Sequence, residues 1–173
     1  MNVVLIGYRG TGKSTVGRIV AERLGLRLVS MDSEIVKRAA LSIPEFVEKY
    51  GWVKFRDLES DVAQELALQK DLVIDTGGGV IERQKNVDHL RRDADVFWLK
   101  ASIHTITGRI RHDASRPALT SGKTFLEEVA EVLEKREPLY SAAAHHIVDT
   151  DDKAPGTIAE EIVTLWERNR GAV

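Results

Sequence analysis

The chain has 173 residues, 43% of them hydrophobic, which is enough for one well-buried domain and short for two. Its formal net charge is −2, with acids and bases mixed along its length, which excludes a chain-wide electrostatic surface for nucleic acid or an anionic membrane. Cysteine is absent, which excludes disulfides and thiolate metal sites, and we expect a monomeric, cytoplasmic protein with a single domain over residues 1–173.

Short apolar or β-branched runs alternate with longer amphipathic ones along the chain, which predicts an α/β fold with a parallel sheet. Two of the runs are less apolar than the others and are expected nearer the sheet edges, whereas nearly all-apolar runs are typical of central parallel strands. The five predicted strands are Val3–Ile6, Arg27–Ser30, Leu72–Asp75, Val96–Leu99 and His146–Val148, of which the second and fifth are the less apolar.

The segments between these strands mostly carry apolar residues at helical spacing. Two stretches lack clear periodicity, His112–Lys123 and Asp149–Pro155, and these are predicted to be mobile loops. The predicted helices are Lys13–Leu24, Ser33–Arg38, Ile43–Glu48, Trp52–Gln69, Arg83–Arg92, Ile103–Arg111, Thr124–Ser141 and Gly156–Asn169.

The segment Gly7–Thr15, GYRGTGKST, matches the P-loop pattern in full and lies between a predicted strand and a predicted helix. In such a loop, backbone N–H groups and the positive end of the helix surround phosphate oxygens. Lys13 would reach the β- and γ-phosphates, and the Ser14 hydroxyl would bind Mg²⁺. A glycine-rich turn that binds nothing is the alternative, but the strand and helix around the motif favour phosphate binding.

Three carboxylates follow predicted strands, where ligands gather in open α/β sheets. Asp32 and Glu34 come after the second strand; one could help to hold Mg²⁺ and the other could take a proton from an acceptor hydroxyl. The alternative is an ordinary helix start, with Asp32 or Ser33 as N-cap. Asp75 ends the third strand before Gly77-Gly78-Gly79 and competes with Asp32 for the metal role.

Arginines occur in several predicted helices and in one aperiodic stretch. Arg56 and Arg136 could clamp a carboxylate bidentately if they converge, although a single helical arginine is usually a solvated charge. Arg116 lies in the aperiodic stretch and could cover the γ-phosphate during transfer, or belong to an ordinary exposed loop.

Taken together, these residues resemble the shikimate kinase family over most of the chain, from Val3 to about Ile162. The P-loop motif is a strong signal by itself. Each of the other motifs is a weak signal alone, and they indicate this family only as an ordered set. The matching pieces are Gly7–Thr15, Asp32-x-Glu34, Ser42-Ile43, Phe55-Arg56 with Glu59, Gly77-Gly78-Gly79, Arg116-Pro117-x-Leu119 and Arg136-x-Pro138-Leu139-Tyr140.

The resemblance implies a three-layer P-loop NTPase fold with a five-stranded parallel sheet, an acceptor-binding segment over residues 33–69 and a lid over residues 112–123. It implies ATP-dependent phosphorylation of the 3-hydroxyl of shikimate in aromatic amino acid biosynthesis, with ATP and Mg²⁺. The residues that it implies are Lys13, Glu34 and Arg116 for catalysis; Gly10, Thr11, Gly12, Lys13, Ser14, Thr15, Arg109, Arg116, Lys153 and Pro155 for the nucleotide; Glu34, Arg56, Gly77, Gly78, Gly79 and Arg136 for shikimate; and Ser14 and Asp32 for the metal.

Three departures from the family pattern fall in the acceptor segment. Glu34 stands where the family has aspartate, Trp52 follows Gly51 where glutamate is common, and the stretch before Ser42 lacks the usual glycine. One added methylene changes the reach of the carboxylate by about 1 Å, a misplacement that can cost ~100-fold in rate. The main alternative is therefore a kinase of the same fold acting on quinate or gluconate, and a more distant one is a nucleotide-dependent switch or binding protein.

Overall fold

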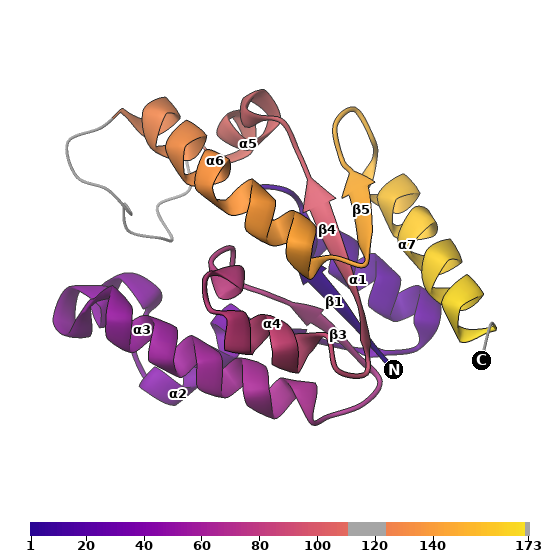
Figure 1. Cartoon of the computed structure of the whole chain (residues 1–173), viewed down its shortest axis with the longest axis horizontal. Coiled ribbons are helices and arrows are strands. Elements are labelled where there is room, and N and C mark those ends of the chain that lie inside the picture. Colours follow the sequence, from indigo (N-terminus) through magenta and orange to yellow (C-terminus); the bar gives the residue numbers. More distant parts are fainter. Residues whose placement is uncertain (111–123, 172–173) are drawn as a thin grey trace.

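The computed structural model describes residues 1–110 and 124–171. The strands form one parallel sheet in the order β2-β3-β1-β4-β5 (Figure 1). The strands are β1 (Asn2–Ile6), β2 (Arg27–Ser30), β3 (Leu72–Asp75), β4 (Ala94–Lys100) and β5 (His146–Asp149). All five predicted strands are confirmed, and the two less apolar ones, β2 and β5, form the sheet edges as expected.

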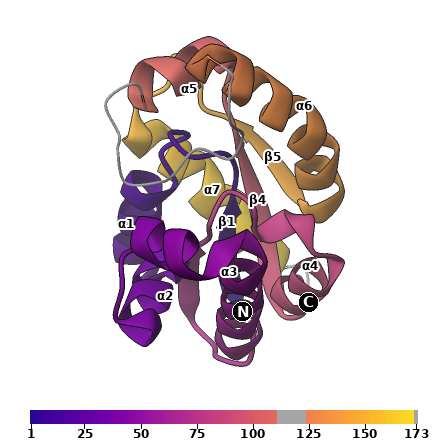
Figure 2. The ribbon, with the colours of Figure 1, turned by 90° about the vertical axis from the view of Figure 1, so that its left-hand side faces the viewer.

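Helices cover both faces of the sheet (Figure 2). Because side chains alternate along a strand, Val4 and Ile6 of β1 pack on one face, with residues of α2, α3, α4 and α6. Val3 and Leu5 pack on the other, with residues of α1 and α7. The helices are α1 (Lys13–Leu24), α2 (Met31–Ala39), α3 (Ile43–Ala67), α4 (Gln84–Leu90), α5 (Ile103–Ile110), α6 (Phe125–Ala143) and α7 (Pro155–Arg170).

The three-layer α/β architecture is therefore the one predicted, and each predicted helix has a counterpart. The predicted helices Ile43–Glu48 and Trp52–Gln69 are the two halves of α3, which bends at Gly51, where φ is 82° and ψ is 167°. A short 3₁₀ helix, η1 (Val80–Glu82), was not predicted. The proposed lid over residues 112–123 lies outside the described residues. Within the part described, no helix is both long and apolar enough to cross a bilayer.

The helix α2 does not begin with Asp32 or Ser33 as its N-cap, which was the alternative interpretation of this stretch. Ser30 takes that position, and its side chain accepts a hydrogen bond from the backbone N–H of Ser33. Asp32 and Glu34 instead lie in the first helical turn, where the helix dipole favours negative charge. The cap explains the helix start without Asp32, so the carboxylate of Asp32 is not needed for that purpose.

Parallel pairing places the carboxyl ends of β1, β2 and β3, which carry the candidate site residues, side by side. Asp75 on β3 is in register with Leu5 on β1 and with Ser30 on β2. The P-loop follows β1, α2 follows β2, and the glycine segment follows β3, so all three meet at the carboxyl edge of the sheet.

One residue of the acceptor segment adopts an unfavourable backbone conformation. Ala40, the C-cap of α2, has φ 52° and ψ 28°, the left-handed region that glycine occupies at much lower cost. We expect Ala40→Gly to raise the free energy of unfolding by about 0.5–1 kcal/mol, measured by urea denaturation. Ala39→Gly is the control, because Ala39 is helical and the same change there should lower stability by about 1 kcal/mol. Equal effects at both positions would contradict the prediction.

Candidate active site

The P-loop surrounds a cavity of about 330 Å³ at the carboxyl edge of the sheet. Gly12 caps α1 with φ 92°, so the loop turns directly into the helix and its N–H groups can face a phosphate. Lys13 is buried, and its ammonium donates to the carbonyls of Gly7 at 2.9 Å and Tyr8 at 3.1 Å. The residues that line the cavity are Arg9, Gly10, Gly12, Lys13, Ser14, Thr15, Ser30, Asp32, Asp75, Thr76 and Gly78.

Oxygen donors gather on one side of this cavity. The Ser14 hydroxyl donates to the Asp75 carboxylate at 2.6 Å, and Asp32 lines the same cavity. A hydroxyl and two carboxylates beside a phosphate-binding loop fit Mg²⁺, which prefers oxygen ligands and keeps several waters. Both candidates for the metal, Asp32 and Asp75, line the same cavity as Ser14, and Asp75 also accepts the hydrogen bond of Ser14.

A second cavity, of about 250 Å³, lies against the outer side of the P-loop. Arg109 on α5 donates to the Gly10 carbonyl at 3.1 Å, which ties that helix to the loop. Lys153 and Pro155, which precede and start α7, reach the same cavity. The three residues that were predicted to surround adenine are therefore brought together beside the P-loop.

A third cavity, of about 380 Å³, lies between α3, η1 and α6. Arg56 and Arg136 both line it, and both are buried, at 9% and 5% exposure. Arg56 also lies 5.4 Å from the Trp52 ring centroid, so its planar cation packs on an aromatic face. Residues 80 positions apart in the chain therefore supply two guanidinium groups to one cavity, which is the convergence that carboxylate binding requires.

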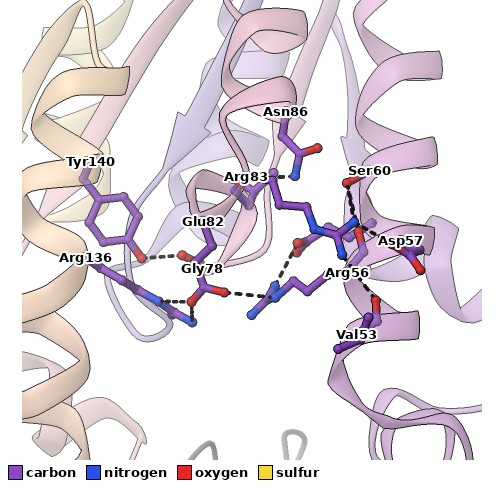
Figure 3. Close-up of polar contacts among 12 residues, drawn as sticks. Val53, Arg56, Asp57, Ser60, Gly78, Glu82, Arg83, Asn86, Arg136 and Tyr140 are labelled. Carbon is purple, nitrogen blue, oxygen red and sulfur yellow. Dashed lines mark hydrogen bonds and ion pairs between the residues drawn. The ribbon is translucent and has the colours of Figure 1, made fainter.

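Each of these arginines is paired with glutamate (Figure 3). Glu59, which is fully buried, accepts from Nη1 of Arg56 at 2.8 Å. Glu82 accepts from Arg136 through Nε at 2.9 Å and Nη2 at 2.7 Å, and lies 3.2 Å from Nε of Arg56. Glu82 is thus a carboxylate already placed between the two guanidinium groups.

The glycine segment, Gly77-Gly78-Gly79, contacts two of these cavities. One is the cavity that the P-loop surrounds (the phosphate cavity), and the other is the cavity that Arg56 and Arg136 line (the arginine cavity). Gly78 lines the phosphate cavity, and a Cβ there would lie 3.4 Å from Nη1 of Arg136. A Cβ at Gly79 would collide with the guanidinium of Arg56. A side chain at this position would displace the guanidinium, so glycine allows Arg56 to lie directly against this segment.

Tyr140 fixes this segment from α6. Its hydroxyl donates to the Gly78 carbonyl (Figure 3). Its ring is fully buried and stacks on Trp98, with the ring centroids 5.7 Å apart. Burial raises the pKa of Tyr140, so the hydroxyl stays protonated and able to donate. Burial alone would lower the pKa of Arg136, but the Glu82 carboxylate that pairs with it favours the charged form and the pKa is raised on balance, so that guanidinium stays charged.

Four predicted residues are not placed in these cavities, among them Gly77 and Gly79, although Gly79 lies against Arg56. Glu34 is half-buried on α2 and does not line any of the three cavities described above. Arg116 lies outside the described residues. Conversely, reasoning from the sequence missed Glu82 and gave Tyr140 no role of its own. The only sequence signal for Glu82 was an acidic residue three positions after the last glycine of a strand-end loop.

A family model described as shikimate kinase matches residues 9–167, which is most of the chain. The chain belongs to the shikimate kinase family. It is 39% identical over 167 residues to the shikimate kinase of Thermodesulfovibrio yellowstonii, covering 96% of this chain and 95% of that protein. It is 41% identical over 164 residues to the Geobacter sulfurreducens shikimate kinase, covering 95% and 90%.

Solved structures of shikimate kinases have the same fold. The chain superimposes on the Acinetobacter baumannii shikimate kinase in complex with shikimate with a TM-score of 0.92 at 35% identity, covering 97% of this chain and 93% of that one. The P-loop NTPase architecture that the resemblance implied is therefore confirmed.

Proposed function

We propose that this shikimate kinase family member transfers the γ-phosphoryl group of ATP to the 3-hydroxyl of shikimate, giving shikimate 3-phosphate and ADP. The observation that carries the proposal is the convergence of Arg56 and Arg136 in a cavity that the glycine segment joins to the P-loop cavity. A carboxylate held by two arginines there would place the ring of the acceptor toward the phosphates. The relative from Acinetobacter baumannii, solved in complex with shikimate, supports the same acceptor.

On the nucleotide side, the P-loop N–H groups and Lys13 would hold the β- and γ-phosphates, with Gly10, Thr11, Gly12 and Thr15 shaping the loop. The cavity lined by Arg109, Lys153 and Pro155 would take adenine. Ser14 and Asp32 would hold Mg²⁺, and Asp75 would orient the Ser14 hydroxyl through their hydrogen bond. Bound Mg²⁺ supplies charge neutralisation at the phosphates.

On the acceptor side, Arg56 and Arg136 would bind the carboxylate, and the backbone of Gly77, Gly78 and Gly79 would contact the hydroxyls. In the transfer step the 3-hydroxyl oxygen forms the bond to the γ-phosphorus, and the bond from that phosphorus to the ADP oxygen breaks. Glu34 would take the hydroxyl proton, and Lys13 and Arg116 would stabilise the charge in transfer. Glu34 lies in the first turn of α2 together with Asp32, which lines the phosphate cavity.

Steady-state ADP release with Mg-ATP tests the proposal directly, comparing shikimate, quinate, gluconate and no acceptor at equal concentrations. We expect a large rate increase with shikimate alone. An increase with quinate or gluconate instead would assign the same fold to another hydroxy acid. ATP binding without stimulation by any acceptor would support a nucleotide-dependent switch.

Removing one of the two arginines should weaken binding of the acceptor and leave binding of the nucleotide unchanged. We expect Arg136→Ala to raise the KM for shikimate by about 10–100-fold, the cost of a lost charge-assisted bidentate contact, with little change in the KM for ATP. Arg92→Ala, an exposed arginine just beyond α4, is the control and should change neither constant. Equal increases in both KM values for Arg136→Ala would mean that the arginine does not bind the acceptor.

A further inference from the structure

Glu82 lies at the end of η1, directly in the cavity that the two arginines line. One carboxylate contacts both guanidinium groups: Oε1 accepts from Nε and Nη2 of Arg136, and Oε2 lies 3.2 Å from Nε of Arg56 (Figure 3). The contact with Arg136 uses two neighbouring N–H donors, the same fork that a ligand carboxylate would use. In this state, Glu82 occupies the position that the acceptor's carboxylate is proposed to take.

The charges of the two arginines are already balanced by carboxylates, and the other two cations that line the cavity, Arg83 and Lys135, pair with Asp57 and Glu131. Two guanidinium groups, Arg56 and Arg136, face two carboxylates, Glu59 and Glu82. A bound acceptor would add a third negative group beside two positive ones. Because the Nε and Nη2 donors of Arg136 cannot serve two carboxylates with good geometry at once, Glu82 has to give way before the acceptor binds this edge of Arg136 bidentately.

The two glutamates differ in their freedom to move. The Glu59 side chain is fully buried and pairs with Arg56 three residues before it on the same helix. The Glu82 side chain is 39% exposed and lines an open cavity, so it can swing into water with little desolvation cost. Glu82 is therefore the carboxylate that can leave.

We propose that Glu82 is an internal competitor for the acceptor: its carboxylate holds Arg56 and Arg136 together in the acceptor-free protein and is displaced by the carboxylate of the substrate. Resting on the proposed function, this inference makes Glu82 a determinant of acceptor affinity and of selectivity for an anionic acceptor. Glu82 aligns the arginines in advance, and its displacement weakens binding by the free energy of the contacts that are lost.

The test compares wild-type protein with Glu82→Gln by calorimetric titration of shikimate and of its neutral methyl ester, without nucleotide. Glutamine keeps the size of the side chain and removes the charge that competes. We expect Glu82→Gln to bind shikimate about 10-fold more tightly, with a matching decrease in the KM for shikimate and an unchanged KM for ATP. Affinity for the methyl ester, which has no carboxylate to compete, should stay within about twofold of wild type.

Glu160→Gln is the control, since Glu160 also accepts from an arginine, Arg23, but lies on α7, outside this cavity and outside the acceptor segment. It should leave shikimate affinity unchanged. Weaker or unchanged shikimate binding in Glu82→Gln, or equal tightening for acid and ester, would overturn the inference while shikimate-dependent ADP release stands. Absence of that release in both proteins, with ATP binding intact, would instead overturn the proposed function and this inference with it.

Discussion

Lys13→Ala should lower kcat by about 10³-fold or more, the largest effect expected of any substitution in this protein. Lys13 is 8% exposed, and its ammonium is held in the P-loop by the carbonyls of Gly7 and Tyr8, so its charge is positioned before any nucleotide arrives. A preorganised cation in a site that excludes water stabilises the charge that develops on the transferred phosphoryl group far more than a solvated one can. Alanine removes that charge, and nothing of similar length replaces it.

The measurement is shikimate-dependent ADP release at saturating substrates, accompanied by thermal unfolding to show that the variant is folded. Lys70→Ala serves as control, because Lys70 is exposed and lies just before β3, away from the carboxyl edge of the sheet. It should turn over at the wild-type rate. A folded Lys13→Ala protein with near-normal kcat would remove the P-loop argument altogether.

Glu34→Gln should lower kcat by about 10²-fold or more while leaving the KM values for shikimate and ATP largely unchanged. The amide has nearly the shape of the carboxylate but cannot accept the proton that the 3-hydroxyl loses during transfer. Because the charge of Glu34 is proposed to act in the chemical step, its loss should appear in kcat and not in binding. Glu34→Asp, which restores the family residue, should remain active within about tenfold of wild type.

Single-turnover measurements would separate the chemical step from product release for this variant. Glu48→Gln, on the exposed side of the same acceptor segment, is the control and should behave as wild type. Undiminished turnover in Glu34→Gln would make Glu34 structural and move the search for the base to Asp32, which lines the phosphate cavity.

Much of the fold was predictable because its signals are local. Strand and helix periods depend on neighbouring residues, so α1 matches its predicted bounds and the two least apolar strands lie at the sheet edges. The P-loop was predictable for the same reason: its phosphate-binding groups are consecutive backbone amides, and they need no distant partner. Gly51 broke the helical pattern in the sequence and bends α3 in the structure. By contrast, the 3₁₀ turn η1 is too short to carry a period and was missed.

The sequence by itself determined the P-loop, the sheet and the identity of the two candidate arginines, because residue type and local spacing are sufficient for these. Only the tertiary structure brought Arg56 and Arg136 into one cavity, placed Asp75 on Ser14 and inserted Glu82 between the arginines. These contacts join residues from 26 to 80 positions apart, and their geometry depends on how α1, α3, η1 and α6 pack around the sheet. No local pattern encodes a distance between side chains on separate helices, so the electrostatic balance of the acceptor cavity is a property of the folded chain.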